Sequence, residues 1–75
     1  MQQSVPPVDA AVGALSEREL EVLRLIAAGR TDREIAEALV LSTHTVHRHV
    51  ANVRSKLGVP SRAAAAAWAA DRGLI

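Results

Sequence analysis

The stretch "TDREIAEALVLSTHTVHRHVANVRSKLG", residues 31–58, decides the fold. It opens with Thr31 followed three positions later by Glu34, the pattern of a capping box at the start of a helix. A second start signal, Ser42, comes soon after, behind the dipeptide "VL". We therefore expect a short helix of about eight residues, a tight connection and a second helix that begins after Ser42.

The second of these helices carries a regular apolar stripe. Its members recur at i, i+4, i+7 and i+11, as one face of an α-helix requires: Val46, Val50, Val53 and Leu57. Gly58 suits the left-handed position that ends many helices, and Pro60 prevents the helix from continuing. The pattern predicts a helix over about fifteen residues that ends at Gly58.

A helix is also expected ahead of this pair. Ser16 and Glu19 form a second capping box, and Gly29 marks the end of the helix. The apolar positions between them predict the buried side: Leu20, Leu23, Ile26 and Ala27.

A fourth helix follows, because Ser61 can cap the alanine-rich run 62–72, which Gly73 closes. Four helices and no strand pattern predict an all-α domain, a four-helix bundle. The domain is expected to cover residues 15–75. Residues 1–14, which contain two prolines and lack periodicity, are interpreted as a flexible tail or linker.

Length and composition limit the classes of function. A chain of 75 residues suits one binding surface better than an enclosed catalytic cleft, so we expect no enzyme. The chain has no cysteine, which excludes disulfides and thiolate metal sites. No apolar run reaches the length of a signal peptide or a membrane span, so a cytoplasmic protein without membrane partners or cofactors is expected.

Charge is distributed unevenly along the chain. Residues 1–39 hold four arginines and seven acidic residues, net −3, whereas residues 40–75 hold four arginines and one lysine against one aspartate, net +4. A short basic stretch inside a chain of net charge +1 is typical of a nucleic-acid reader.

The pair of helices within residues 31–58 has the requirements of a helix-turn-helix. Ala36 provides a small residue where the two helices cross, and Ile35 and Leu39 provide anchors. The position after Leu39 often holds glycine, because the chain turns there through positive φ. Since positive φ is costly for Val40, we expect a turn of different shape.

A helical wheel of residues 43–57 places a polar, basic face opposite the apolar stripe. Arg48 lies at its centre, where it could donate two hydrogen bonds to a guanine edge in the major groove of DNA. His44 and Ala51 lie beside Arg48, and His47 lies on the flank. Residues on the flanks and on the preceding helix are expected to contact phosphates: Thr31, Arg33, Thr45, Asn52, Arg54 and Lys56.

The sequence also resembles a known family. The elements "LSERELEVL", "EIA", "STHTVHRHV", "NV" and "KLGVPSR" are similar to the DNA-binding domain of the LuxR family of bacterial transcription regulators, of the FixJ and NarL type. The resemblance covers residues 15–75. It implies a tetrahelical helix-turn-helix domain without a wing, whose third helix enters the major groove.

The resemblance also implies roles for individual residues. The positions of His47, Arg48 and Ala51 approach bases in such regulators, and His44 is added from the wheel. His47 and Ala51 stand where the family often has lysine or another long polar residue, so base preference cannot be transferred.

The resemblance further implies that the last helix supports dimerisation, so we expect a homodimer on a pseudo-palindromic double-stranded site, from which RNA polymerase is recruited or blocked. The residues expected at the dimer contact are Ala63, Ala64, Ala67, Ala70 and Asp71.

Other interpretations remain open. Three histidines in six positions could suggest a metal site, but His49 points away from His44 and His47, and no acidic residue completes a ligand set. His49 borders the apolar stripe and is expected to be partly buried and hydrogen-bonded. The alternative functions are a polymerase-associated module like region 4 of a sigma factor, or a protein-interaction domain that has lost DNA binding.

Overall fold

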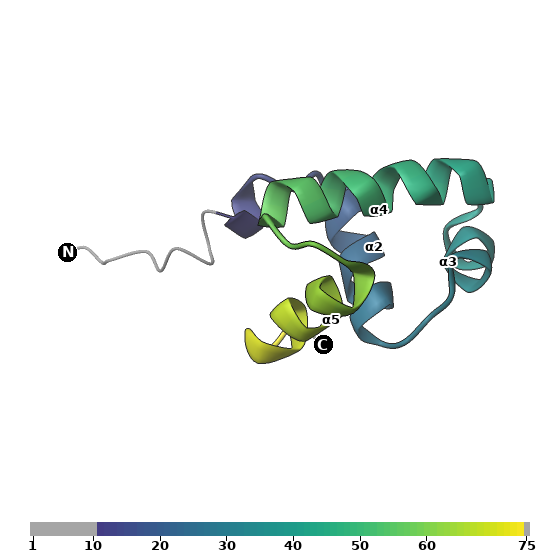
Figure 1. Cartoon of the computed structure of the whole chain (residues 1–75). Coiled ribbons are helices and arrows are strands. Elements are labelled where there is room, and N and C mark those ends of the chain that lie inside the picture. Colours follow the sequence, from purple (N-terminus) through teal and green to yellow (C-terminus); the bar gives the residue numbers. More distant parts are fainter. Residues whose placement is uncertain (1–10, 75) are drawn as a thin grey trace.

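The computed structural model describes residues 11–74, which form an all-helical domain (Figure 1). Its helices are α2 (Glu17–Ala27), α3 (Asp32–Leu39), α4 (Thr43–Leu57) and α5 (Arg62–Asp71). No strand occurs within this range, so the predicted all-α, four-helix fold is confirmed. Of the expected tail, residues 1–10 lie outside the described residues. Residues 11–13, for which no helix is expected from the sequence, form a helical turn whose Val12 is partly buried.

All four helices begin at the residues that the sequence indicates. The Glu19 amide donates to Ser16 Oγ at 3.0 Å, and the Ser16 amide donates to Glu19 Oε1 at 2.9 Å. Thr31 and Glu34 repeat this exchange at the start of α3. Ser42 and Ser61 accept from backbone amides in the first turns of α4 and α5. These bonds satisfy amides that a helix leaves without partners in its first turn.

The core consists of two adjoining apolar clusters, and α2 and α4 contribute to both. The first joins α2, α3 and α4 through Val22, Ile26, Ile35, Ala36, Val46 and Val50. The second joins α2, α4 and α5 through Leu23, Val53, Ala65 and Ala69. Because α3 packs on the first cluster and α5 mainly on the second, α4 is held along most of its length.

The buried stripe of α2 differs from the predicted one. Val22 is fully buried, whereas Leu20 is only half-buried. The stripe runs instead through Glu19, Val22, Leu23 and Ile26. Its polar member, Glu19, is tolerated there because its carboxylate is paired with Lys56 of α4.

The turn between α3 and α4 contradicts the expectation for Val40. This residue adopts the left-handed conformation, with φ 56° and ψ 52°, despite its β-branched side chain. The conformation lets the Val40 and Leu41 amides both donate to Ala36 O, and Leu41 then packs on the first cluster. The prediction of a different turn is wrong, since packing on both sides of the turn imposes positive φ on valine.

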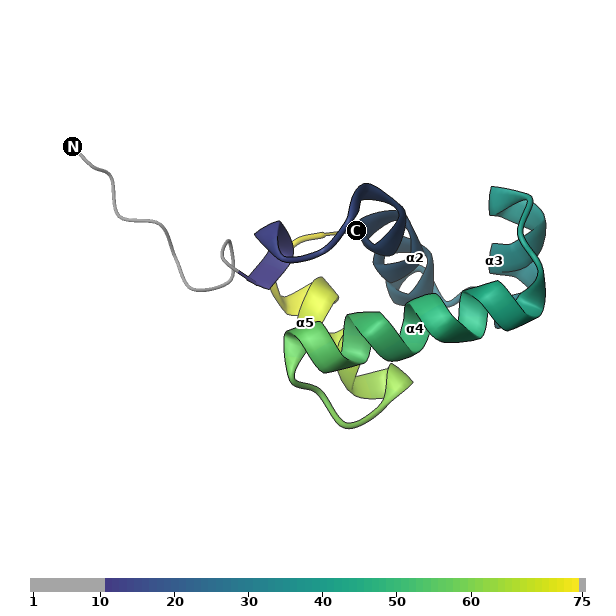
Figure 2. The same ribbon diagram turned by 90° about the horizontal axis from the view of Figure 1, so that it is seen from above.

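The helices α2, α3 and α5 all lie on one side of α4. In Figure 1, α4 runs along the top of the molecule, with α3 below its first turns and α5 below its last turns. Figure 2, viewed from above, shows α4 crossing in front of α2, with α3 and α5 near its two ends. No described helix covers the far side of α4, and this side is the candidate interface.

Candidate nucleic-acid interface

The uncovered side of α4 presents the residues that the helical wheel places opposite the apolar stripe. His44, His47, Arg48 and Ala51 are all exposed, while Val46 and Val53 on the other side are fully buried. Asn52 and Ser55 are exposed as well. The structure thus brings the four expected base-contacting residues onto one surface, although their contacts with DNA remain a prediction.

One flank of α4 is tied to α2 through Lys56. Its Nζ lies 2.7 Å from Glu19 Oε1, and the Glu19 side chain is only 7% exposed. The hydrogen bond from Lys56, together with the Ser16 amide, lowers the pKa of the Glu19 carboxyl below its usual value, although burial opposes this. Lys56 therefore stabilises the position of α4. Its side chain is still 39% exposed, and its expected contact with phosphate remains a prediction.

Arg54, another expected phosphate contact, also bonds within the domain. Its Nη2 donates to the carbonyl oxygen of Pro60 at 2.6 Å, and the Val59 amide donates to Arg54 O at 3.0 Å. These bonds fix the short loop between α4 and α5. Arg54 is half-buried, and its Nε is enclosed with no partner among the described residues.

The opposite flank of α4 is joined to α3 and α5 by one carboxylate. Asp32 Oδ2 lies 2.9 Å from His47 Nε2, and Asp32 Oδ1 accepts a hydrogen bond from Arg62 Nη1. Arg62 Nη2 in turn donates to the carbonyl oxygen of Arg30. Asp32 is 25% exposed, so it lies at the edge of the candidate interface between two basic groups.

Arg48 differs from the other permanent cations of α4. Lys56 and Arg54 bond to groups of the domain, whereas no ion pair or hydrogen bond of the Arg48 side chain occurs within residues 11–74. A guanidinium that is exposed at the centre of a convex helix face is available to an external acceptor. Its five N–H donors match two acceptors on a guanine edge or the oxygens of a phosphate.

The remaining expected phosphate contacts lie at the start of α3 and on α4. Arg33 is 85% exposed in its side chain, and its Nε lies 3.7 Å from Glu37 one turn away. Asn52 is exposed, while Thr45 is half-buried and accepts a hydrogen bond from the Ser42 hydroxyl at 3.0 Å. Thr31 is exposed but serves as the cap of α3.

The outer side of α5 carries most of the residues expected at a dimer contact. Ala63, Ala67, Ala70 and Asp71 are exposed, and Ala64 is half-buried. Trp68 packs on the second cluster, and the Arg72 guanidinium stacks 4.3 Å from the centre of its ring. The exposed alanines form a smooth strip along one side of the helix.

His49 is half-buried, as predicted, but its expected hydrogen bond is absent for one nitrogen. Its Nδ1 is enclosed and has no partner among the described residues. Within the same residues, no three histidine and acidic side chains converge as metal ligands would. No helix in this part of the chain has the length and apolar character needed to cross a membrane.

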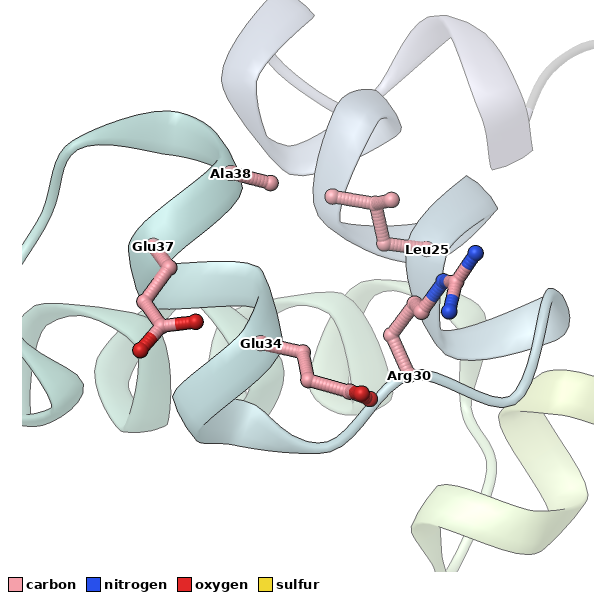
Figure 3. A pocket seen from close by; sticks show the side chains of 5 residues that line it. All are labelled: Leu25, Arg30, Glu34, Glu37 and Ala38. Atoms are coloured by element: carbon pink, nitrogen blue, oxygen red, sulfur yellow. The ribbon is translucent and has the colours of Figure 1, made fainter.

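One hollow of the surface lies away from this face, between α2 and α3. It is an open groove of about 480 Å³ lined by Leu25, Arg30, Glu34, Glu37 and Ala38 (Figure 3). The two glutamates of α3 line one side of it, so its charge does not favour phosphate. The groove is therefore not part of the candidate nucleic-acid interface.

Comparison with known proteins agrees with this geometry. A profile of the bacterial regulatory proteins of the luxR family matches residues 13–69. The chain belongs to the luxR family. It contains the helix-turn-helix DNA-binding domain of these transcriptional regulators, which are not enzymes. The resemblance inferred from the sequence is thereby confirmed.

Individual luxR relatives are considerably longer than this chain. It is 45% identical over 62 residues to the transcriptional regulatory protein LiaR of Bacillus subtilis, covering 83% of the chain and 29% of LiaR. It is 46% identical over 61 residues to the response regulator protein VraR of Staphylococcus aureus, covering 81% of the chain and 29% of VraR. The chain thus spans less than a third of either relative.

Three residues of this luxR domain that shape the interface were not predicted from the sequence. Glu19 was interpreted only as a capping residue, and no role was assigned to Asp32 or Arg62. Their partners lie on other helices, 37 residues away for Glu19 and 30 residues apart for Asp32 and Arg62. Helical periodicity describes one helix at a time and carries no signal for such pairs.

Proposed function

We propose that this domain binds a specific double-stranded DNA site by inserting the uncovered side of α4 into the major groove. The observation that carries the proposal is the exposed Arg48 at the centre of that side, which has no partner within residues 11–74 and is flanked by His44 and His47. An α-helix fits the major groove, where each base pair presents a distinct pattern of donors and acceptors. The Lys56–Glu19 ion pair on one flank and the contact of His47 with Asp32 on the other support the proposal, because they tie the reading helix to its neighbours.

Phosphate contacts are proposed to come from the edges of the same surface. Arg33 at the start of α3 and Asn52 on α4 are both exposed, which supports a contact of each with the backbone of DNA. Lys56 and Arg54 can add charge to this surface while they keep their bonds within the domain. Such contacts orient the domain on DNA without selecting a sequence.

We further propose that two copies bind together through α5. The exposed residues Ala63, Ala67 and Ala70 follow one another at i, i+4 and i+7, so that a second helix can approach closely. A symmetric dimer requires a pseudo-palindromic site with half-sites about one helical turn apart. The dimer acts in the cytoplasm by occupancy of a promoter, where it recruits or blocks RNA polymerase.

Selection of bound duplexes from a random pool tests the proposal. We expect enrichment of one sequence, repeated in inverted orientation. Ala67→Arg, which adds a large charged group to the strip on α5, should weaken binding to the full site and leave binding to a single half-site unchanged. Enrichment of no sequence would refute specific recognition. An unchanged affinity of the Ala67 variant for the full site would refute the proposed dimer contact.

A further inference from the structure

We propose that Asp32 is a positioning residue for base recognition, which acts through His47 and thereby sets the class of base that His47 selects. This inference rests on the proposed function, because it assumes that the uncovered side of α4 faces DNA. It starts from the contact between Asp32 Oδ2 and His47 Nε2, which are 2.9 Å apart.

The contact determines which nitrogen of the imidazole is left for a ligand. A carboxylate oxygen is only an acceptor, so a bare Nε2 lone pair facing it at this distance would be repelled. Nε2 therefore carries a hydrogen in the neutral ring as well as in the charged ring. Because Nε2 is turned toward α3, Nδ1 is the ring nitrogen that remains for DNA, and the His47 side chain is 64% exposed.

The state of Nδ1 then defines the chemistry of its partner. In the neutral ring Nδ1 carries no hydrogen and can only accept a hydrogen bond. In the major groove, the donors are the amino groups of adenine (N6) and cytosine (N4), whereas guanine and thymine present acceptors at the corresponding positions. Neutral His47 is thus directed toward adenine or cytosine, while Arg48 beside it can select guanine.

Asp32 is itself fixed by a second partner. Arg62 of α5 binds the other carboxylate oxygen and also the carbonyl oxygen of Arg30, so the carboxylate cannot rotate freely to follow the imidazole. The charged or titratable groups near His47 are Asp32 of α3, Arg62 of α5, which binds Asp32, and His44 and Arg48 on α4 itself. A side chain anchored by another helix loses less conformational freedom when it binds DNA.

A double-mutant cycle with Asp32→Ala and His47→Ala tests the inference on the selected duplex. The measured quantity is the ratio of two affinities, that for this duplex and that for a duplex altered only at the base pair next to His47. Binding is measured at about pH 8, above the range in which histidines ordinarily titrate. We expect each single variant to lower this ratio about fivefold, the loss of one hydrogen bond. The double variant should lose no more than either single variant, because Asp32 acts through His47.

Control variants separate this positioning role from a general effect of charge and from a loss of stability. Glu37→Ala also removes one carboxylate from α3 but leaves His47 untouched, and its ratio should equal that of the wild type. Asp32→Asn keeps an oxygen that can accept from Nε2 and should recover part of the ratio lost in Asp32→Ala. If Asp32→Ala does not fold, Asp32→Asn takes its place in the cycle, with a smaller expected loss.

The outcomes distinguish this inference from the proposed function. Additive losses in the double variant, or a wild-type ratio in the Asp32 variants, would overturn the positioning role and leave DNA binding intact. An unchanged affinity for a duplex in which the N6 or N4 amino group of the adenine or cytosine next to His47 is replaced by hydrogen would overturn the assignment of Nδ1 as acceptor. Failure of the wild-type domain to prefer any duplex would refute the proposed function instead.

Discussion

Replacement of Val40 by glycine should stabilise the domain. Val40 lies in the left-handed region, which costs an L-residue about 1–2 kcal/mol, and β-branching makes the cost larger. Glycine removes this cost but adds about 0.4–1 kcal/mol of conformational entropy to the unfolded chain. Because Val40 is 89% exposed, the change removes no buried contact. The net gain is about 1 kcal/mol, which raises Tm by about 4–8 °C in a domain of this size.

Urea and thermal unfolding followed by circular dichroism measure this gain. The matched control is Ala38→Gly, two residues earlier on the exposed side of α3, where the backbone is helical. Glycine should destabilise the domain there by up to about 1 kcal/mol, since it is the poorer helix former. The two glycine variants are thus expected to shift the unfolding midpoint in opposite directions. A midpoint for Val40→Gly at or below that of the wild type would refute the reasoning about backbone strain.

Three further predictions concern stability and the binding of DNA. The Glu19 carboxyl has a lowered pKa in the folded state. Its stabilising effect is therefore complete above pH 4.5, the usual pKa of this group, and is lost as the pH falls through the pKa of the folded state. In urea unfolding at a series of pH values, Glu19→Gln should therefore lose less stability than the wild type on acidification, and parallel profiles would contradict this. Ile35→Ala should cost about 2–5 kcal/mol, because Ile35 is fully buried, and a urea midpoint near that of the wild type would be inconsistent with the core described above. Arg33→Ala should weaken binding to all duplexes alike and reduce the slope of log affinity against log salt by about 1, and an unchanged slope would exclude a phosphate contact.

The helices and their ends could be predicted from the sequence because local chemistry determines them. Ser16, Thr31, Ser42 and Ser61 each satisfy amides within their own first turn, so the signal is contained in a few residues. The exposed side of α4 was predictable for a similar reason, since its apolar stripe repeats regularly over the whole helix.

The features that required the structure depend on how the helices cross. Val40 is forced into positive φ by packing on both sides of the turn, against its own preference. Glu19 occupies a buried position because Lys56 of another helix reaches it. Asp32 meets His47 because α3 crosses the first turns of α4. In each case, packing or pairing between helices decides the outcome, and neither propensity nor periodicity describes it.

Arg48 on the uncovered side of α4 is proposed to read a base. Fluorescence anisotropy of the selected duplex and of a scrambled duplex, with the wild-type domain and Arg48→Ala, tests it most directly. We predict that the wild type prefers the selected duplex and that Arg48→Ala lowers this preference about tenfold, since a bidentate contact contributes about 1–3 kcal/mol of discrimination. If Arg48→Ala weakens binding to both duplexes equally, or to neither, the preference is unchanged and the assignment of α4 as the reading helix through Arg48 is contradicted.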